Sequence, residues 1–362
     1  LNIPDPGVHI LEYIFEYGLF LAQAITFVAA FLIVVAGVIT LGQRQRSEHH
    51  EGHIEVRDVN EKYRDIGRHI QQMVVEPELL KESKKAEKKA EKVRLKAQKK
   101  KRGKAVDEAE RRNRLYVLDF DGDLRASATD NLREEISAVL PQVQAGDELL
   151  LRVESPGGLV HGYGLAASQL QRIRDANVPL TIAVDKVAAS GGYMMACVGN
   201  RIIAAPFAVI GSIGVLAQLP NFHRLLKKND IDFELFTAGE YKRTVTMFGE
   251  NTDKGREKFS EELEETHELF KEFVSANRPA LDIARVATGE IWYGRKALEV
   301  GLIDELQTSD AFVQGRLADW DVFEVKFVHK KSWQEKLGLA AEGAMEKAFL
   351  RIWQKGLERN TL

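Results

Sequence analysis

From Arg114 onward the sequence alternates short apolar runs with segments whose apolar residues recur at helical spacing. Strands that alternate with helices pair in parallel, because each helix returns the chain to the same end of the sheet. Runs that are apolar almost throughout indicate strands with both faces covered. We therefore predict an α/β fold with a parallel sheet and helices packed on its faces. Strands are expected at 114–122, 147–154, 179–185, 201–206 and 231–236, helices at 129–143, 161–176, from 190 and at 254–279, and a short helix with a last strand within 287–306.

An apolar segment at 18–42 carries no charged side chain over its whole length. About 20 apolar residues span a bilayer, so this segment is predicted to be a single transmembrane helix. A cleavable signal peptide would need basic residues before the apolar run, and this chain has acidic ones there. Arg44 and Arg46 follow the segment, so the positive-inside rule favours the cytoplasmic side for the rest of the chain.

Residues 43–113 are predicted to be a charged linker or stalk between that helix and a globular domain at 114–328. The stretch 81–104 is strongly basic, with 13 Lys and Arg residues against three Glu residues. One interpretation is a solvated helix or a disordered arm. A second is attraction to anionic lipid headgroups, at up to about 1 kcal/mol per basic residue near the surface. The basic stretch has neither the aromatic residues that would stack on bases nor a recognisable nucleic-acid-binding fold, so no nucleic-acid partner is expected.

The two ends of the chain and its single cysteine say little about function. Residues 1–17 are a short N-terminal segment before the apolar run, and 329–362 are predicted to hold a C-terminal amphipathic helix. That helix could cover the domain, pack on a neighbouring subunit or lie along a membrane. Cys197 is the only cysteine, which excludes an intramolecular disulfide, and its apolar neighbours favour a small buried side chain.

Two glycine-rich turns follow predicted strands and could bind an acyl group. The sequence ESPGG at 154–158 offers backbone amides that can approach a carbonyl oxygen closely, since glycine has no Cβ. Ser190 begins a predicted helix and is followed by Gly191 and Gly192, where a helix N-terminus stabilises negative charge. Taken alone, each turn is better explained as ordinary chain geometry, the serine being a helix N-cap.

A serine hydroxyl is a weak nucleophile and needs a base. Lys242 follows a glycine turn after the predicted strand 231–236, and burial can keep a lysine neutral. Lys186 is a rival, but the adjacent Asp185 would hold it protonated. Among the histidines of the globular domain, His161, just after the ESPGG turn, is the one expected near the site.

Three motifs occur in a specific order: SPGG at 155–158, AASGGYMMA at 188–196 and GSIGV at 211–215, followed by AGEYKR at 238–243. This set resembles the signal peptide peptidase A family of serine peptidases, and the apolar segment and basic stalk are most similar to its short membrane-bound members. The resemblance covers roughly 114–306. It implies the ClpP and crotonase superfamily fold, a repeated β-β-α/βα core with a parallel sheet, which agrees with the alternation above.

The resemblance also implies residue roles. Ser190 would be the nucleophile and Lys242 the general base and acid, while Ser212 would hydrogen-bond to the lysine and orient it. The oxyanion hole would be formed by backbone amides near the glycines of the two turns, namely Gly157, Gly158 and Gly191. Three side chains after the serine would line an apolar substrate pocket, although core packing explains the methionines equally well: Tyr193, Met194 and Met195.

The implied activity is that of a membrane-anchored serine endopeptidase of the bacterial inner membrane. It would hydrolyse apolar peptides or membrane-associated, signal-peptide-like substrates, without a metal or other cofactor. Family members assemble as rings in which the lysine can come from a neighbouring subunit. This chain has one such domain, so a homo-oligomer with shared sites is expected. Two alternatives stay open: a catalytically inactive membrane scaffold of the same fold, and a crotonase-type acyl-CoA enzyme, which would want carboxylates at the site.

Overall fold

The computed structural model describes residues 17–21, 23, 25–28, 52–75, 89, 92 and 111–330. The chain divides into two units, one comprising 1–53 with 329–362 and the other 54–328. In the first unit the described stretches 17–21 and 25–28 are helical and expose their apolar side chains. Most of the predicted membrane helix, of the basic stretch and of the predicted C-terminal helix lies outside the described residues. Within the part that is described, no helix is long and apolar enough to cross a membrane.

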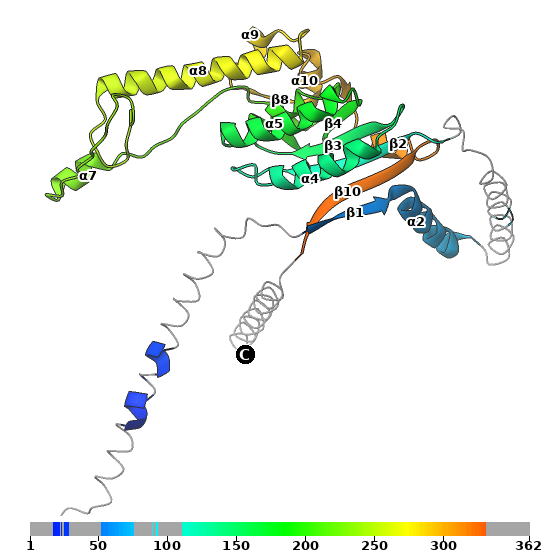
Figure 1. The fold of residues 1–362 in the computed structure, drawn as a ribbon, viewed down its shortest axis with the longest axis horizontal. Helices are drawn as coiled ribbons and strands as arrows, with labels where there is room; N and C mark the ends of the chain where they lie inside the picture. Colours follow the sequence, from blue (N-terminus) through cyan, green and yellow to red (C-terminus); the bar gives the residue numbers. More distant parts are fainter. Residues whose placement is uncertain are drawn as a thin grey trace, which may run out of the picture. The chain divides into compact units, whose positions relative to one another are not determined.

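The second unit is built on a seven-stranded sheet in the order β1-β10-β2-β3-β4-β6-β9 (Figure 1). From β10 to β9 every neighbouring pair is parallel, as the sequence pattern predicts. The strands are β2 (Arg114–Asp121), β3 (Glu148–Glu154), β4 (Leu180–Val184), β6 (Arg201–Ala204), β9 (Glu305–Leu306) and β10 (Asp321–His329).

Helices cover both faces of this sheet. On one face, the alternate residues of β2 such as Leu118 and Phe120 pack in a core with α4, α5 and α6. On the other face, Leu115 and Val117 pack with Phe312 of α11 in a second, smaller cluster. Both predicted layers of helices are therefore present. The helices of the first face are α4 (Thr129–Val139), α5 (Val160–Asp175) and α6 (Gly191–Ala196), and α11 (Ser309–Gln314) lies on the second.

A second, three-stranded sheet has the order β5-β7-β8. Its strands are β5 (Val187–Ala189), β7 (Val209–Gly211) and β8 (Ile291–Tyr293), the first two parallel and the last antiparallel. Each strand has only three residues, too few to show a period in the sequence. This small sheet lies directly before α6 and therefore positions Ser190.

The predicted linker 43–113 is wrong for part of its length. It contains β1 (Gly52–Asp58), which lies at the edge of the main sheet, and α2 (Val59–Val74), whose Val59 is buried in the second core cluster. Asp58 caps α2, its Oδ1 accepting a hydrogen bond from the Glu61 amide at 2.8 Å. The charged surroundings concealed a strand and a helix that belong to the globular unit.

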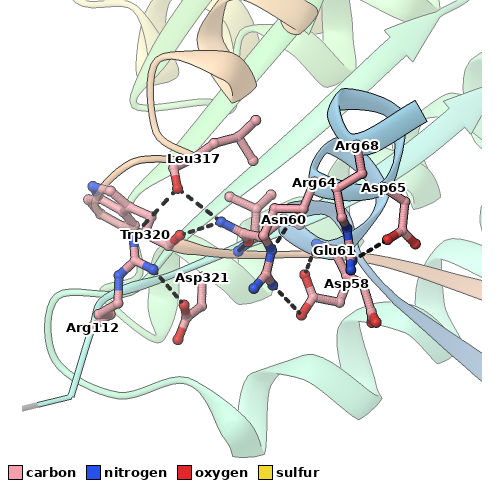
Figure 2. A network of polar contacts seen from close by, with 11 residues as sticks. Asp58, Asn60, Glu61, Arg64, Asp65, Arg68, Arg112, Leu317, Trp320 and Asp321 are labelled. Carbon is pink, nitrogen blue, oxygen red and sulfur yellow. Dashed lines mark hydrogen bonds and ion pairs between the residues drawn. The ribbon is translucent and has the colours of Figure 1, made fainter. Parts of the chain in front are cut away.

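Asn60 fastens α2 to the loop before β10 (Figure 2). Its Nδ2 donates to the carbonyl oxygens of Leu317 and Trp320, at 3.0 and 2.9 Å, and its Oδ1 accepts from the Val322 amide at 2.7 Å. These bonds join residues more than 250 positions apart in the chain. The globular unit therefore begins well before Arg114.

The predicted strand 231–236 is also wrong. Residues 216–250, which we call the arm, contain α7 (His223–Lys228) and no strand. Ile231, Phe233 and Leu235 alternate as in a half-buried strand, yet all three are exposed, because no neighbouring strand lies beside them in the described part of the chain. The arm lies at the start of the long helix α8 (Asp253–Asn277), away from the sheet (Figure 1).

Candidate active site

Two strand ends bring the ESPGG turn against Ser190. Ser155 forms an isolated parallel bridge with Ala188, in which the Ser155 amide donates to the Val187 carbonyl at 2.8 Å. The Ala189 amide donates in turn to the Ser155 carbonyl at 3.0 Å. The turn after β3 and the serine after β5 therefore leave the sheets side by side.

Gly157 shows how close this contact is. A Cβ added there would lie 2.7 Å from both the Ser190 Cβ and the Gly191 nitrogen, closer than real Cβ atoms approach. Gly157 also has a φ of 90°, a left-handed conformation that glycine adopts readily. The glycine in the turn is thus required both by its backbone conformation and by the nearness of Ser190.

The backbone of Ser190 is strained. Its φ is 51° and its ψ −118°, a combination that costs a non-glycine residue about 1–3 kcal/mol. The Gly211 carbonyl accepts from the Ser190 amide at 2.7 Å and helps to hold this conformation. A strained serine between a strand and a helix is also how α/β-hydrolases present their nucleophile. The Ser190 side chain makes no capping bond to α6, so the simple N-cap interpretation does not account for it.

Two backbone amides beside Ser190 are available to a ligand. Within the described residues, the amides of Gly158 and Gly191 have no hydrogen-bond acceptor. The Gly157 amide, by contrast, donates to the Ser155 hydroxyl at 3.1 Å. Of the three glycines predicted for the oxyanion hole, the geometry therefore favours Gly158 and Gly191 as the donors. Gly157 instead allows the turn to approach Ser190 closely.

The buried hydroxyls of Tyr163 and Ser155 contact each other and help to hold the ESPGG turn. The Tyr163 hydroxyl donates to the Asp123 carbonyl at 2.7 Å and lies 2.5 Å from the Ser155 hydroxyl. Burial raises the pKa of Tyr163, so it stays a donor. A Cβ on Gly191 would lie 2.3 Å from the Tyr163 ring. No sequence motif pointed to Tyr163, because its role depends on packing between α5 and α6.

Ser212 lies next to Ser190 through the small sheet. The register of β5 and β7 places Gly211 opposite Ala189, so the serines that follow each strand are neighbours. Ser212 also has a left-handed φ, 51°, and its amide donates to the Glu290 carbonyl at 2.7 Å. The structure therefore brings Ser190, Ser212 and the two amides together.

Lys242 lies elsewhere in the same chain. It is exposed on the arm, and the ring of the adjacent Tyr241 lies 5.7 Å from the ammonium groups of Lys254 and Lys258 near the start of α8. On α8 the buried side chains that join the core begin with Phe270, twelve residues after Lys258. At 1.5 Å per residue this is about 18 Å along the helix, so the arm at Tyr241 lies beside a part of α8 that has no buried side chain.

The two rival bases, Lys186 and His161, are exposed, as Lys242 is. Lys186 is exposed, and a hydrogen bond of 2.9 Å to Glu154 raises its pKa, so it is held protonated. The partner is thus Glu154 rather than the adjacent Asp185, which instead accepts from Ser309. His161 is exposed in the first turn of α5.

The residues after the serine form part of the core. Tyr193 and Met195 are fully buried and Met194 is 8% exposed, while the Tyr193 hydroxyl donates to the Leu302 carbonyl at 2.9 Å. This favours core packing over a substrate pocket. Cys197 is buried, and burial raises its pKa, as expected for a small apolar side chain. Among the described residues, no three His, Cys, Asp or Glu side chains are grouped to hold a metal.

Comparisons with known proteins assign the family. The model of the peptidase family S49 N-terminal region matches residues 12–170, and that of peptidase family S49 matches 172–320. The probable protease SohB of Haemophilus influenzae is 51% identical over 328 residues, 90% of this chain and 92% of that protein. A probable protease SohB of Buchnera aphidicola (subsp. Schlechtendalia chinensis) is 46% identical, over 84% of this chain and 100% of its own.

The chain therefore belongs to peptidase family S49, with the SohB proteases as similar members, and this membership supports a serine peptidase. A solved mutant of the 1510-N membrane-bound stomatin-specific protease with a substrate peptide covers 62% of this chain and 96% of its own. Its TM-score is 0.39 at 14% identity, too low to inform the site of this chain.

Proposed function

We propose that this chain is a serine endopeptidase in which Ser190 is the nucleophile and Lys242 the general base and acid. The observation that carries the proposal is the strained Ser190 beside two free amides, those of Gly158 and Gly191. That arrangement suits an acyl carbonyl whose oxygen becomes negative as the nucleophile attacks. Ser212, next to Ser190, would accept a hydrogen bond from the lysine ammonium and orient it.

The reaction is acyl transfer to the serine and then to water. Neutral Lys242 takes the Ser190 proton while the serine oxygen attacks the peptide carbonyl, and the amides of Gly158 and Gly191 hold the oxyanion. The C–N bond breaks as the lysine returns that proton to the leaving amine. Water, deprotonated by the same lysine, then hydrolyses the acyl-enzyme and regenerates the free serine.

We further propose that the lysine reaches the serine of a neighbouring subunit in a homo-oligomeric ring. The support is that Lys242 is exposed, on an arm that lies beside the part of α8 without buried side chains. Large apolar side chains are exposed along the arm, as expected of a surface that another subunit covers: Leu216 (79%), Leu225 (57%) and Phe236 (87%).

The proposed setting is a bacterial inner membrane, with 18–42 as the anchor and the domain on the cytoplasmic side. Apolar segments near that membrane, including signal-peptide-like ones, are the proposed substrates. The support is the uncharged length of 18–42, the arginines after it and the net positive charge of 81–104. Cysteine labelling before and after 18–42 in whole cells tests the sidedness, and labelling of 81–104 from outside would contradict it.

Cleavage of fluorogenic apolar peptides by the full chain in membranes or detergent tests the chemistry. Ser190→Ala and Lys242→Ala should each lower kcat by about 10⁴-fold or more. Lys228→Ala, an exposed lysine of the same arm, is the matched control and should keep the parental rate. Retained cleavage in Ser190→Ala would overturn the nucleophile. An assembled parent that cleaves nothing would favour the inactive scaffold.

A further inference from the structure

Beside the free amide of Gly158 lies a cluster of exposed apolar side chains. Leu124 is 67% exposed, Leu159 41% and Val160 45%. We infer that these three residues, the ledge, bind an apolar side chain of the substrate next to the scissile bond, with Leu124 as the main contact. The inference rests on the proposed peptidase function. A single exposed leucine needs no explanation, but a cluster of three at a reacting centre does.

The ledge is tied to the oxyanion amides by direct backbone contact. A Cβ on Gly158 would lie 2.2 Å from the Leu124 carbonyl oxygen and 2.8 Å from its Cα. The Leu159 amide donates to that same carbonyl at 2.8 Å. Gly157, the preceding residue, touches Ser190 and Gly191. The glycine turn therefore lies between Ser190 on one side and the ledge on the other.

A substrate held at these amides must pass the ledge. Its scissile carbonyl oxygen would lie against Gly158 and Gly191, and consecutive residues of an extended peptide are about 3.3–3.6 Å apart. A residue that flanks the scissile bond is then within side-chain reach of Leu124. Apolar contact is what the ledge offers, because its exposed side chains carry no polar atom.

The loop that carries Leu124 is fixed in its outward conformation. Asp123 accepts hydrogen bonds through its carboxylate from the amides of Arg125 and Ser127, at 3.0 and 2.9 Å, and from the Ser127 hydroxyl at 2.7 Å. Its carbonyl accepts from Tyr163 at 2.7 Å. These Ser127 bonds lower the pKa of Asp123, so the carboxylate persists at neutral pH. The leucine is therefore displayed by a pre-organised loop, which avoids an ordering cost on binding.

The test uses the full chain and peptides that differ only at residues flanking the scissile bond, with Leu, Phe, Ser, Lys or Glu at each place. Leu124→Ser should lower kcat/KM about 10- to 100-fold for the Leu and Phe peptides and change the Ser peptide little. Leu124→Met should keep the parental preference, and Leu124→Lys should raise the relative rate of the Glu peptide. Leu269→Ser is the matched control, since Leu269 on α8 is 65% exposed.

Three results would overturn the inference. Leu124→Ser could leave all peptides unchanged, could slow them all equally, or could change the mass of the assembly without changing the preference. The last would mean that a neighbouring subunit covers the ledge. Failure of the proposed function can be told apart from failure of this inference. If no cleavage depends on Ser190, peptide binding to the Ser190→Ala variant, measured by fluorescence anisotropy, still tests the ledge. Equal affinity of the Leu and Phe peptides with and without Leu124→Ser would then refute the inference.

Discussion

Co-assembling Ser190→Ala protomers with Lys242→Ala protomers is expected to restore peptidase activity that neither variant has alone. In the structure, Lys242 is exposed, and the adjacent Tyr241 lies beside Lys258 of α8, about 18 Å of helix before Phe270, the first α8 residue buried in the core. One protomer would therefore supply the intact serine and its neighbour the intact lysine. In a head-to-tail ring with random equal occupancy, about one quarter of the sites combine the two intact groups. We expect about one quarter of the parental kcat, with KM unchanged.

The assay uses full-length protomers that carry two different tags, co-expressed and purified on both tags in turn. Mass spectrometry gives the composition of the assemblies, and a fluorogenic apolar peptide reports the rate. A second mixture, of parent with the double variant Ser190→Ala/Lys242→Ala, serves as control. At equal occupancy a shared site leaves about one quarter of the activity, whereas a site within one chain leaves about half.

The reasoning would be refuted by mixed assemblies of verified composition that cleave no faster than the separate variants. Half of the parental activity in the control mixture would point the same way. Lys242 would then serve the Ser190 of its own chain. Either result would decide where the general base comes from.

Two further predictions concern single side chains. The carboxyl of Glu135 is buried, which raises its pKa from 4.5 to about 7, so between these pH values the folded chain keeps a proton that the unfolded chain has lost and stability falls as the pH rises. In urea unfolding, the stability of Glu135→Gln relative to the parent should grow by about 2.5 kcal/mol from pH 5 to pH 8, and a constant difference would contradict this. Gly158→Ala would place a methyl group 2.2 Å from the Leu124 carbonyl oxygen and should lower kcat at least about 100-fold, as loss of an oxyanion donor does. Gly164→Ala in α5 meets no atom within 4 Å, so it should keep the rate; an equal loss of rate in both variants would argue against the oxyanion role.

The main sheet could be predicted because its information is local. The runs that became β2, β3, β4 and β6 are apolar on both faces, and the helices between them repeat at helical spacing. The strand predicted at 231–236 is wrong because strand formation also needs a partner strand, and none lies beside this segment among the described residues. Strand β1 was not predicted because it has only two apolar residues and lies in a highly charged part of the sequence. Strand β5 was not predicted because three residues are too few to show a period.

The site divides in the same way. The serine and the glycines follow from short motifs whose backbone conformation is set within a few residues, as the left-handed φ of Ser190 and Gly157 shows. Tyr163 and Leu124 could not be found in this manner, because each contacts the ESPGG turn from a different element. The position of Lys242 relative to a serine is not a property of one chain if the neighbouring subunit supplies it.

Strand β1 has a consequence for how this protein can be cut for study. It covers one side of β10, whose amide and carbonyl groups would otherwise form a free sheet edge. Such an edge is a template on which other chains add strands and aggregate. A truncated chain that begins near Ala105 keeps every catalytic candidate, yet it loses β1, the buried Val59 and the three bonds of Asn60. Insolubility or inactivity of that fragment would report on an uncovered edge and not on Ser190.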